Sequence, residues 1–191
     1  MSRSAEESRA FRGVDVSREA AAAAARGIPA EKTLRAVYRR HRAMGARDRR
    51  FAADLAFAVF RWRGWLPPLE DDPARVAALA AWLDGMPSDG PAGALYALID
   101  GLPPPAGDRP LEERARLLHP FVDGARVRAA EDLVPGWIAE ALPPASACGV
   151  DAAGFASSLQ RPPPVWVSAP RGHGGRFRAA FAERGVELLD R

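Results

Sequence analysis

Apolar residues along most of this chain recur every three or four positions, which is the spacing of one face of an α-helix. The clearest case is the segment RDRRFAADLAFAVFRWRGWL, residues 47–66, in which Phe51, Leu55 and Trp62 mark one face. Most of the other positions in this segment are apolar as well. The pattern predicts a central helix that is buried on nearly every side, with Asp48 as its N-cap.

Helix signals also precede this segment. Residues 1–13 are polar and are expected to be disordered, and Ser17 is expected to cap a helix that Gly27 ends. A second helix is expected from Pro29 to Gly45. Its predicted buried face consists of Leu34, Val37, Tyr38 and His41, and its opposite face of Lys32, Arg35, Arg39 and Arg42.

The middle of the chain carries short helix signals that prolines separate. The segment DDPARVAALAAWLDG predicts a helix with Asp72 as its cap and Pro73 at its first position. The other predicted helices lie in GPAGALYALIDG, DRPLEERARLLH, VPGWIAEALPP and DAAGFASSLQ. The sequence therefore predicts a mainly α fold, with an all-helical bundle over residues 14–142.

The pattern changes in the last part of the chain, residues 143–191. Residues 165–168, VWVS, favour a strand, residues 175–184 a helix and residues 186–189 a second strand. A short, incomplete β-α-β segment of this kind cannot bury both of its faces. We therefore expect it either to pack on the helical bundle or to belong to a polypeptide that continues past Arg191.

Charge is distributed unevenly along the chain. Residues 1–65 carry 15 basic and 7 acidic residues, a net charge of +8, whereas residues 66–160 carry 6 and 14, a net charge of −8. A basic first third is typical of a protein that offers one face to a polyanion. The alternative is a globule in which the basic and acidic parts neutralise each other.

Guanidinium groups suit phosphate because their planar fork can donate two hydrogen bonds at once. Arginines cluster on the second predicted helix and at both ends of the central one, although simple helix-end electrostatics could also account for any one of the latter. The candidate RNA-binding residues are Arg35, Arg39, Arg42, Arg47, Arg49, Arg50, Arg61 and Arg63.

Other chemistry has little support in the sequence. The one cysteine, Cys148, excludes an intrachain disulfide, and with no membrane-length apolar run or leader the chain is expected to be cytoplasmic. The histidines and the cysteine lack the spacing of a metal site, and RGHGGRF, residues 171–177, lacks the spacing of a phosphate-binding loop. The five tryptophans are expected to pack in the core rather than to stack on bases.

Two motifs in order resemble a known family. DRRFAADLAFAVFRWRGWL resembles the central helix of the NusB-like RNA-binding domain that opens the Sun/Fmu methyltransferases, the family of ribosomal RNA small subunit methyltransferase B. VPGWIAEAL followed by FASSLQRPPPVWVSA resembles the linker and first strand of the same family. The resemblance extends from about Val16 to the C-terminus.

The resemblance implies an RNA-binding region, with 16S ribosomal RNA as the partner, ahead of a domain that binds S-adenosylmethionine and methylates cytosine C5. Neither catalytic cysteine of the family has a counterpart here, because Cys148 lies outside their Pro-Cys setting. This chain alone is therefore expected to hold no cofactor and to be inactive, with the catalytic domain missing. The alternatives are a stand-alone NusB-like factor of the antitermination type, which binds RNA with a protein partner, and an inactive remnant.

Overall fold

The computed structural model describes residues 4–122, 128–141, 149, 151–160 and a few single positions between 175 and 183. The chain divides into two units, Met1–Gln160 and Arg161–Arg191. The predicted strands at 165–168 and 186–189, most of the predicted helix at 175–184, and Cys148 lie outside the described residues.

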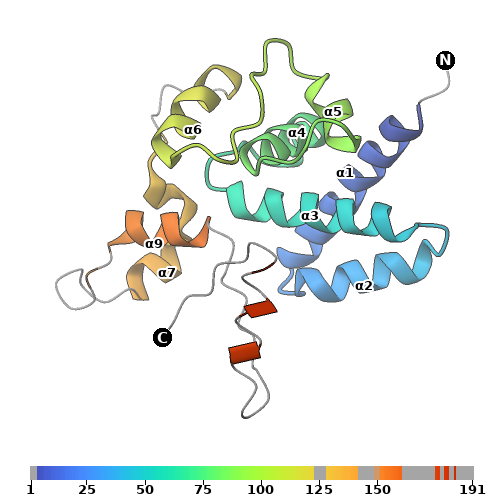
Figure 1. The fold of residues 1–191 in the computed structure, drawn as a ribbon, viewed down its shortest axis with the longest axis horizontal. Helices are drawn as coiled ribbons and strands as arrows, with labels where there is room; N and C mark the ends of the chain where they lie inside the picture. Colours follow the sequence, from blue (N-terminus) through green and yellow to red (C-terminus); the bar gives the residue numbers. More distant parts are fainter. Residues whose placement is uncertain are drawn as a thin grey trace. The chain divides into compact units, whose positions relative to one another are not determined.

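All regular secondary structure in the described residues is helical, which confirms the prediction of a mainly α fold (Figure 1). The longer helices are α1 (Ala5–Ala24), α2 (Ala30–Arg40), α3 (Ala46–Trp62) and α4 (Pro73–Leu83). The shorter ones are α5 (Pro91–Tyr96), α6 (Leu111–Leu118), η1 (His119–Phe121), η2 (Ala130–Leu133), α7 (Gly136–Ala141) and α9 (Ala152–Leu159).

The prediction of disorder was wrong for residues 5–13, because α1 begins at Ala5. Ser4 and Glu7 form a capping box, in which the Ser4 hydroxyl accepts from the Glu7 amide at 3.1 Å and the Glu7 carboxylate accepts from the Ser4 amide. Ser17, predicted to cap this helix, is buried within it and donates to the Gly13 carbonyl at 2.9 Å. The buried face of α1 consists mostly of small residues, so its helical period was hidden in the sequence.

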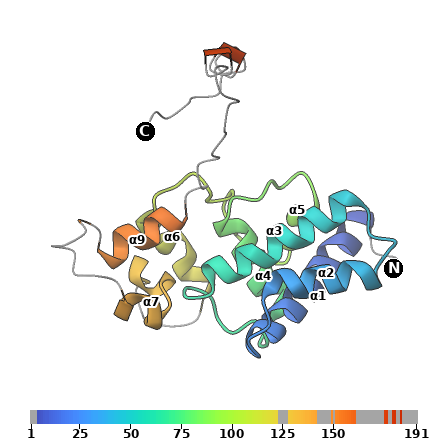
Figure 2. The ribbon, with the colours of Figure 1, turned by 90° about the horizontal axis from the view of Figure 1, so that it is seen from below.

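Small residues allow α1 and α3 to approach closely. A Cβ atom added to Gly13 would lie 2.7 Å from the ring of Phe51 and 3.1 Å from Leu55. Contact this short leaves no room for a larger residue. Gly13 therefore favours this close crossing of α1 and α3. Helix α2 lies beside them (Figure 2), and its Leu34 and Val37 belong to one hydrophobic cluster with residues of both helices.

The prediction of Asp48 as the N-cap of α3 was wrong, because the N-cap is Gly45, three residues earlier, and Asp48 lies in the first turn. The buried face of α3 includes Leu55 and Trp62, but Asp54 and Phe57 are exposed. The prediction that this helix is buried on nearly every side was therefore wrong. His41, predicted on the buried face of the second helix, is its exposed C-cap residue.

The helix with the greatest burial is α4, in which every residue from Val76 to Leu83 is buried. Asp72 caps it by accepting from the Arg75 amide at 3.1 Å, and Pro73 stands at the first position, as predicted. It contacts α1, α3 and α5. A helix apolar on all sides belongs in the middle of a bundle, and α4 holds that place here.

The C-terminal end of α3 is joined to η2. The Trp65 indole donates to the Ala129 carbonyl at 2.7 Å, and a Cβ atom on Gly64 would overlap the Asp132 carbonyl. Leu133 and Ala156 extend the same core toward η2 and α9. The two ends of α3 therefore lie in different surroundings, which matters for the arginines they carry.

Candidate nucleic-acid interface

Four exposed arginines lie in or next to the connection from α2 to α3, and we call them the corner arginines: Arg39, Arg42, Arg47 and Arg50. Arg39 lies in the last turn of α2, Arg42 in the connection, and the other two at the start of α3. Within the described part of the chain, none of the four forms a salt bridge. Their guanidinium groups are therefore accessible to an anion in solvent.

Arg49 differs from its neighbours because it packs between α3 and α2. Its guanidinium carbon lies 5.9 Å from the centre of the Tyr38 ring, and its Nε atom is buried. The Tyr38 hydroxyl donates to the Arg49 carbonyl oxygen at 2.9 Å. Burial raises the pKa of the Tyr38 phenol, so this donor stays protonated at neutral pH. Arg49 therefore contributes mainly to the packing of α3 against α2, and it is less accessible to a ligand than the corner arginines are.

Arg35 lies one turn before the corner on the exposed side of α2. Its guanidinium is 2.6 Å from the Glu31 carboxylate within the same helix, and both side chains are more than two-thirds exposed. Exposed pairs at this spacing contribute only about 0.3–0.5 kcal/mol, so a phosphate could displace Glu31. We therefore rank Arg35 below the corner arginines as a candidate phosphate contact, because it must first release Glu31.

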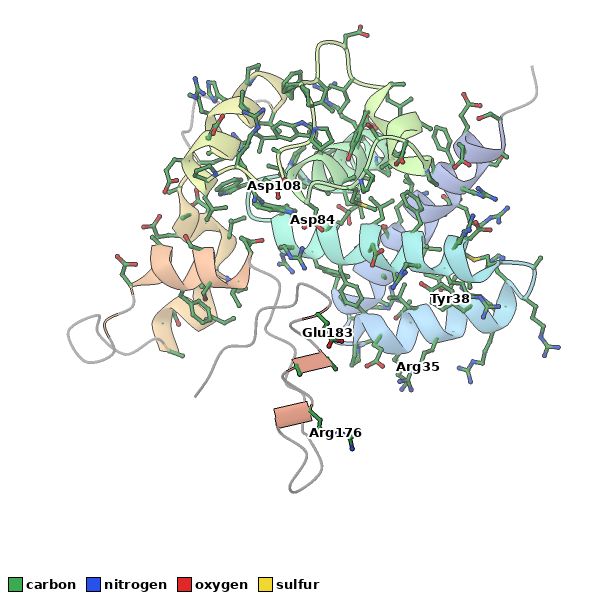
Figure 3. The ribbon with its side chains drawn as sticks, in the orientation of Figure 1. Arg35, Tyr38, Asp84, Asp108, Arg176 and Glu183 are labelled. Carbon is green, nitrogen blue, oxygen red and sulfur yellow. The ribbon has the colours of Figure 1, made fainter. Side chains whose placement is uncertain are left out.

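Arg61 and Arg63 lie at the opposite end of α3. At 1.5 Å per residue, Arg61 is about 17 Å along the helix from Arg50. Arg61 forms a salt bridge with Asp84, the C-cap residue of α4, whereas Arg63 is exposed. Figure 3 shows Tyr38 and Asp84 near opposite ends of α3. The structure therefore does not bring Arg61 and Arg63 together with the corner arginines.

Two arginines that the sequence analysis missed join the corner from α1. The Arg9 Nε atom lies 3.1 Å from the Asp48 carboxylate, and an Arg12 Nη atom lies 3.8 Å from it. Both arginine side chains remain about half exposed. The spacing of Ser4 and Glu7 as a capping box was the signal that could have revealed this helix and its cations.

Two kinds of feature were not found among the described residues, a membrane-spanning helix and a cluster of metal ligands. None of the helices there is both long enough and apolar enough to cross a membrane. Likewise, no three side chains among the described histidines, cysteines, aspartates and glutamates group together as metal ligands.

Comparison of the chain with protein-family models, with curated proteins and with solved structures finds no match.

Proposed function

We propose that the helical unit is an RNA-binding module that holds a ribonucleotide backbone at the corner arginines. By the resemblance of its sequence motifs, it is the kind of module that opens the Sun/Fmu ribosomal RNA cytosine-C5 methyltransferases, with 16S ribosomal RNA as the partner. The observation that carries the proposal is the presence of four exposed guanidinium groups, from two helices and their connection, with no described carboxylate bound to them.

Electrostatics favours a polyanion at this surface. The corner arginines form no salt bridge with a described carboxylate, whereas the neighbouring Arg9 pairs with Glu6 at 2.8 Å and shares Asp48 with Arg12. Arginine can donate two parallel hydrogen bonds to a phosphate, and each phosphate that is neutralised releases counterions from the nucleic acid. The affinity should therefore fall steeply with salt. The proposal assigns binding to these helices and leaves chemistry to the domain that follows in the family.

The test is a filter-binding titration of 16S ribosomal RNA fragments over a range of salt concentrations. We expect the double variant Arg47→Ala with Arg50→Ala to weaken binding and to reduce the slope of log affinity against log salt by about 1–2, because each lost phosphate contact contributes roughly 0.7–0.9.

A matched control removes the same charge elsewhere. Arg18 on α1 lies beside Asp15, and Arg116 on α6 is exposed. Replacing both with alanine should leave the salt slope close to that of the unmodified protein. A slope that responds equally to both double variants would mean that only the net charge matters, and the corner would lose its role.

A further inference from the structure

One exposed side of α3 carries the pattern that supports a more specific inference. Arg47, Arg50, Asp54, Phe57 and Arg61 are all exposed and follow one another at spacings of three and four residues. Side chains at this spacing lie above one another on the same side of a helix. The line of side chains runs from the corner to Asp84, and we call it the α3 outer face.

Phe57 is unusual on this face. Its side chain is 46% exposed, and it is the one aromatic residue among the large hydrophobic residues that the described part of the chain exposes, the others being Ile28, Leu98 and Leu159. Full burial of a phenylalanine side chain is worth about 1.5–3 kcal/mol, which this position gives up in part. A phenyl ring held in solvent near arginines is typical of a surface that stacks on nucleic-acid bases.

The charges around Phe57 favour a base rather than a phosphate at that point. Asp54 lies one turn away and repels a phosphate, and Arg61 on the other side is already bound to Asp84. A neutral base is compatible with both neighbours. The nearest cation on this face without a salt bridge is Arg50, about 10 Å along the helix, which is two turns.

Resting on the function proposed above, we infer that the α3 outer face binds single-stranded RNA, with a base stacked on Phe57 and the adjoining backbone held by Arg50 and Arg47. A duplex does not fit this arrangement, because its bases are already stacked within the helix and only unpaired bases can turn toward a side chain. The strand therefore follows α3 from the corner arginines toward Asp84.

The experiment compares a short oligoadenylate with an abasic ribose-phosphate strand of the same length, by fluorescence anisotropy. The abasic strand keeps the phosphates and lacks the bases. We expect Phe57→Leu to weaken binding of oligoadenylate about tenfold, in line with the loss of one stacked base, and to leave binding of the abasic strand unchanged. Phe57→Tyr keeps an aromatic ring and should retain most of the affinity.

Leu98→Ala is the matched control, because Leu98 is equally exposed, at 46%, and follows α5 in the chain, so it is not part of the α3 outer face. It should change neither titration. An equal loss with both strands in Phe57→Leu, or no loss with either, would overturn the inference, and so would tighter binding of duplex RNA than of oligoadenylate.

The two proposals fail in different ways. If the unmodified protein binds both strands equally, with a salt slope that depends on Arg47 and Arg50, the stacking inference fails and the RNA-binding proposal stands. If neither strand, nor the ribosomal fragments, binds in a salt-dependent manner, the RNA-binding proposal itself fails.

Discussion

The two ends of α3 use the same residue type for opposite purposes. At the corner, Arg47 and Arg50 are exposed and form no salt bridge with the described residues. At the other end, Arg61 is bound to Asp84, and Arg114 of α6 is buried close by, with 8% of its surface exposed. The first end offers charge to a ligand, and the second uses charge to join helices of the bundle.

Asp84 is the centre of the second arrangement. Its carboxylate accepts hydrogen bonds from Arg61 and, at 3.0 Å, from the Trp62 indole. The Arg114 guanidinium lies 5.2 Å from the centre of the Trp62 ring. Burial lowers the pKa of Arg114, while the nearby Asp84 acts in the opposite direction and helps to keep it charged.

Arg114 also satisfies backbone groups around the end of α4. It donates to the carbonyl oxygens of Arg109, at 2.7 Å, Leu83, at 3.1 Å, and Gly107. Gly107 can lie there because Gly85, with a φ of 73°, brings no Cβ atom against it.

The contrast between the two ends of α3 shows that the number of arginines in a region does not measure its capacity to bind RNA. The presence of a carboxylate or a carbonyl from another element decides which arginines remain accessible.

Among these predictions, removing Arg114 should cause the largest loss of stability. We expect Arg114→Met to lower the free energy of unfolding by about 3 kcal/mol, because three carbonyl oxygens lose a donor and Asp84 loses a nearby positive charge. Urea denaturation followed by circular dichroism measures this change. Arg116→Ala, two residues away and exposed, should stay within about 0.5 kcal/mol of the unmodified protein. Equal stability of the two variants would show that Arg114 has no structural role.

Neutralising Asp84 should have the next largest effect. In Asp84→Asn, Arg61 and Arg114 lose their attraction to a carboxylate that is only 18% exposed, and we expect unfolding to cost about 1–2 kcal/mol less. Asp100→Asn changes an exposed carboxylate and serves as the control. Asp84→Asn also releases Arg61 from its salt bridge, so the affinity of the Asp84→Asn protein for RNA should rise slightly while its stability falls.

Substitutions at the corner arginines should change the affinity for RNA and leave the stability of the protein nearly unchanged. We expect Arg47→Ala with Arg50→Ala to change the free energy of unfolding by less than about 0.5 kcal/mol, because exposed side chains that form no salt bridge with the described residues contribute little to stability. Thermal unfolding by circular dichroism checks this expectation beside the RNA titration. A large loss of stability in this variant would mean that the corner arginines are structural, as Arg114 is.

Much of the fold could be predicted from local patterns. Asp72 with Pro73 gave the start of α4 correctly, and Gly27, with a φ of 77°, lies just beyond the end of α1 as predicted. The start of α1 was missed because its buried face is mostly alanine, glycine and serine, which give a weak apolar period. Residue types alone also could not show that α4, and not α3, is the helix buried on all sides.

The candidate site could be predicted only in part, because charge partners are distant in sequence. Arg61 and Asp84 are 23 residues apart, and Arg9 and Asp48 come from different helices, so nothing local indicates either pair. The corner arginines, in contrast, belong to a helix, a short connection and the next helix. Their proximity follows from chain continuity, which a sequence does show.

The smallest predicted effect concerns Asp54, the one carboxylate on the α3 outer face between the two ends. Burial, with the negative charge of Asp84 adding to it, raises the pKa of Asp54 above its ordinary value of 3.8, and Arg50 opposes this in part. The folded protein therefore binds the Asp54 proton more tightly than the unfolded chain does. It follows that stability falls as the pH rises from 3.8 through the pKa in the folded state, and that the ionised carboxylate is unfavourable at neutral pH.

Asp54→Asn should consequently melt at a slightly higher temperature than the unmodified protein near neutral pH. The difference should shrink as the pH falls through the raised pKa toward 3.8, where the Asp54 carboxyl takes up its proton in both states. Thermal unfolding at a series of pH values measures it, with Asp89→Asn as the baseline for replacing an exposed carboxylate. Asp54→Asn should also bind RNA more tightly than the unmodified protein, because the α3 outer face loses its central negative charge. A difference that grew on acidification would show that Asp54 is instead stabilised in its charged form by Arg50, and the outer face would then be a neutralised pair rather than an extension of the corner.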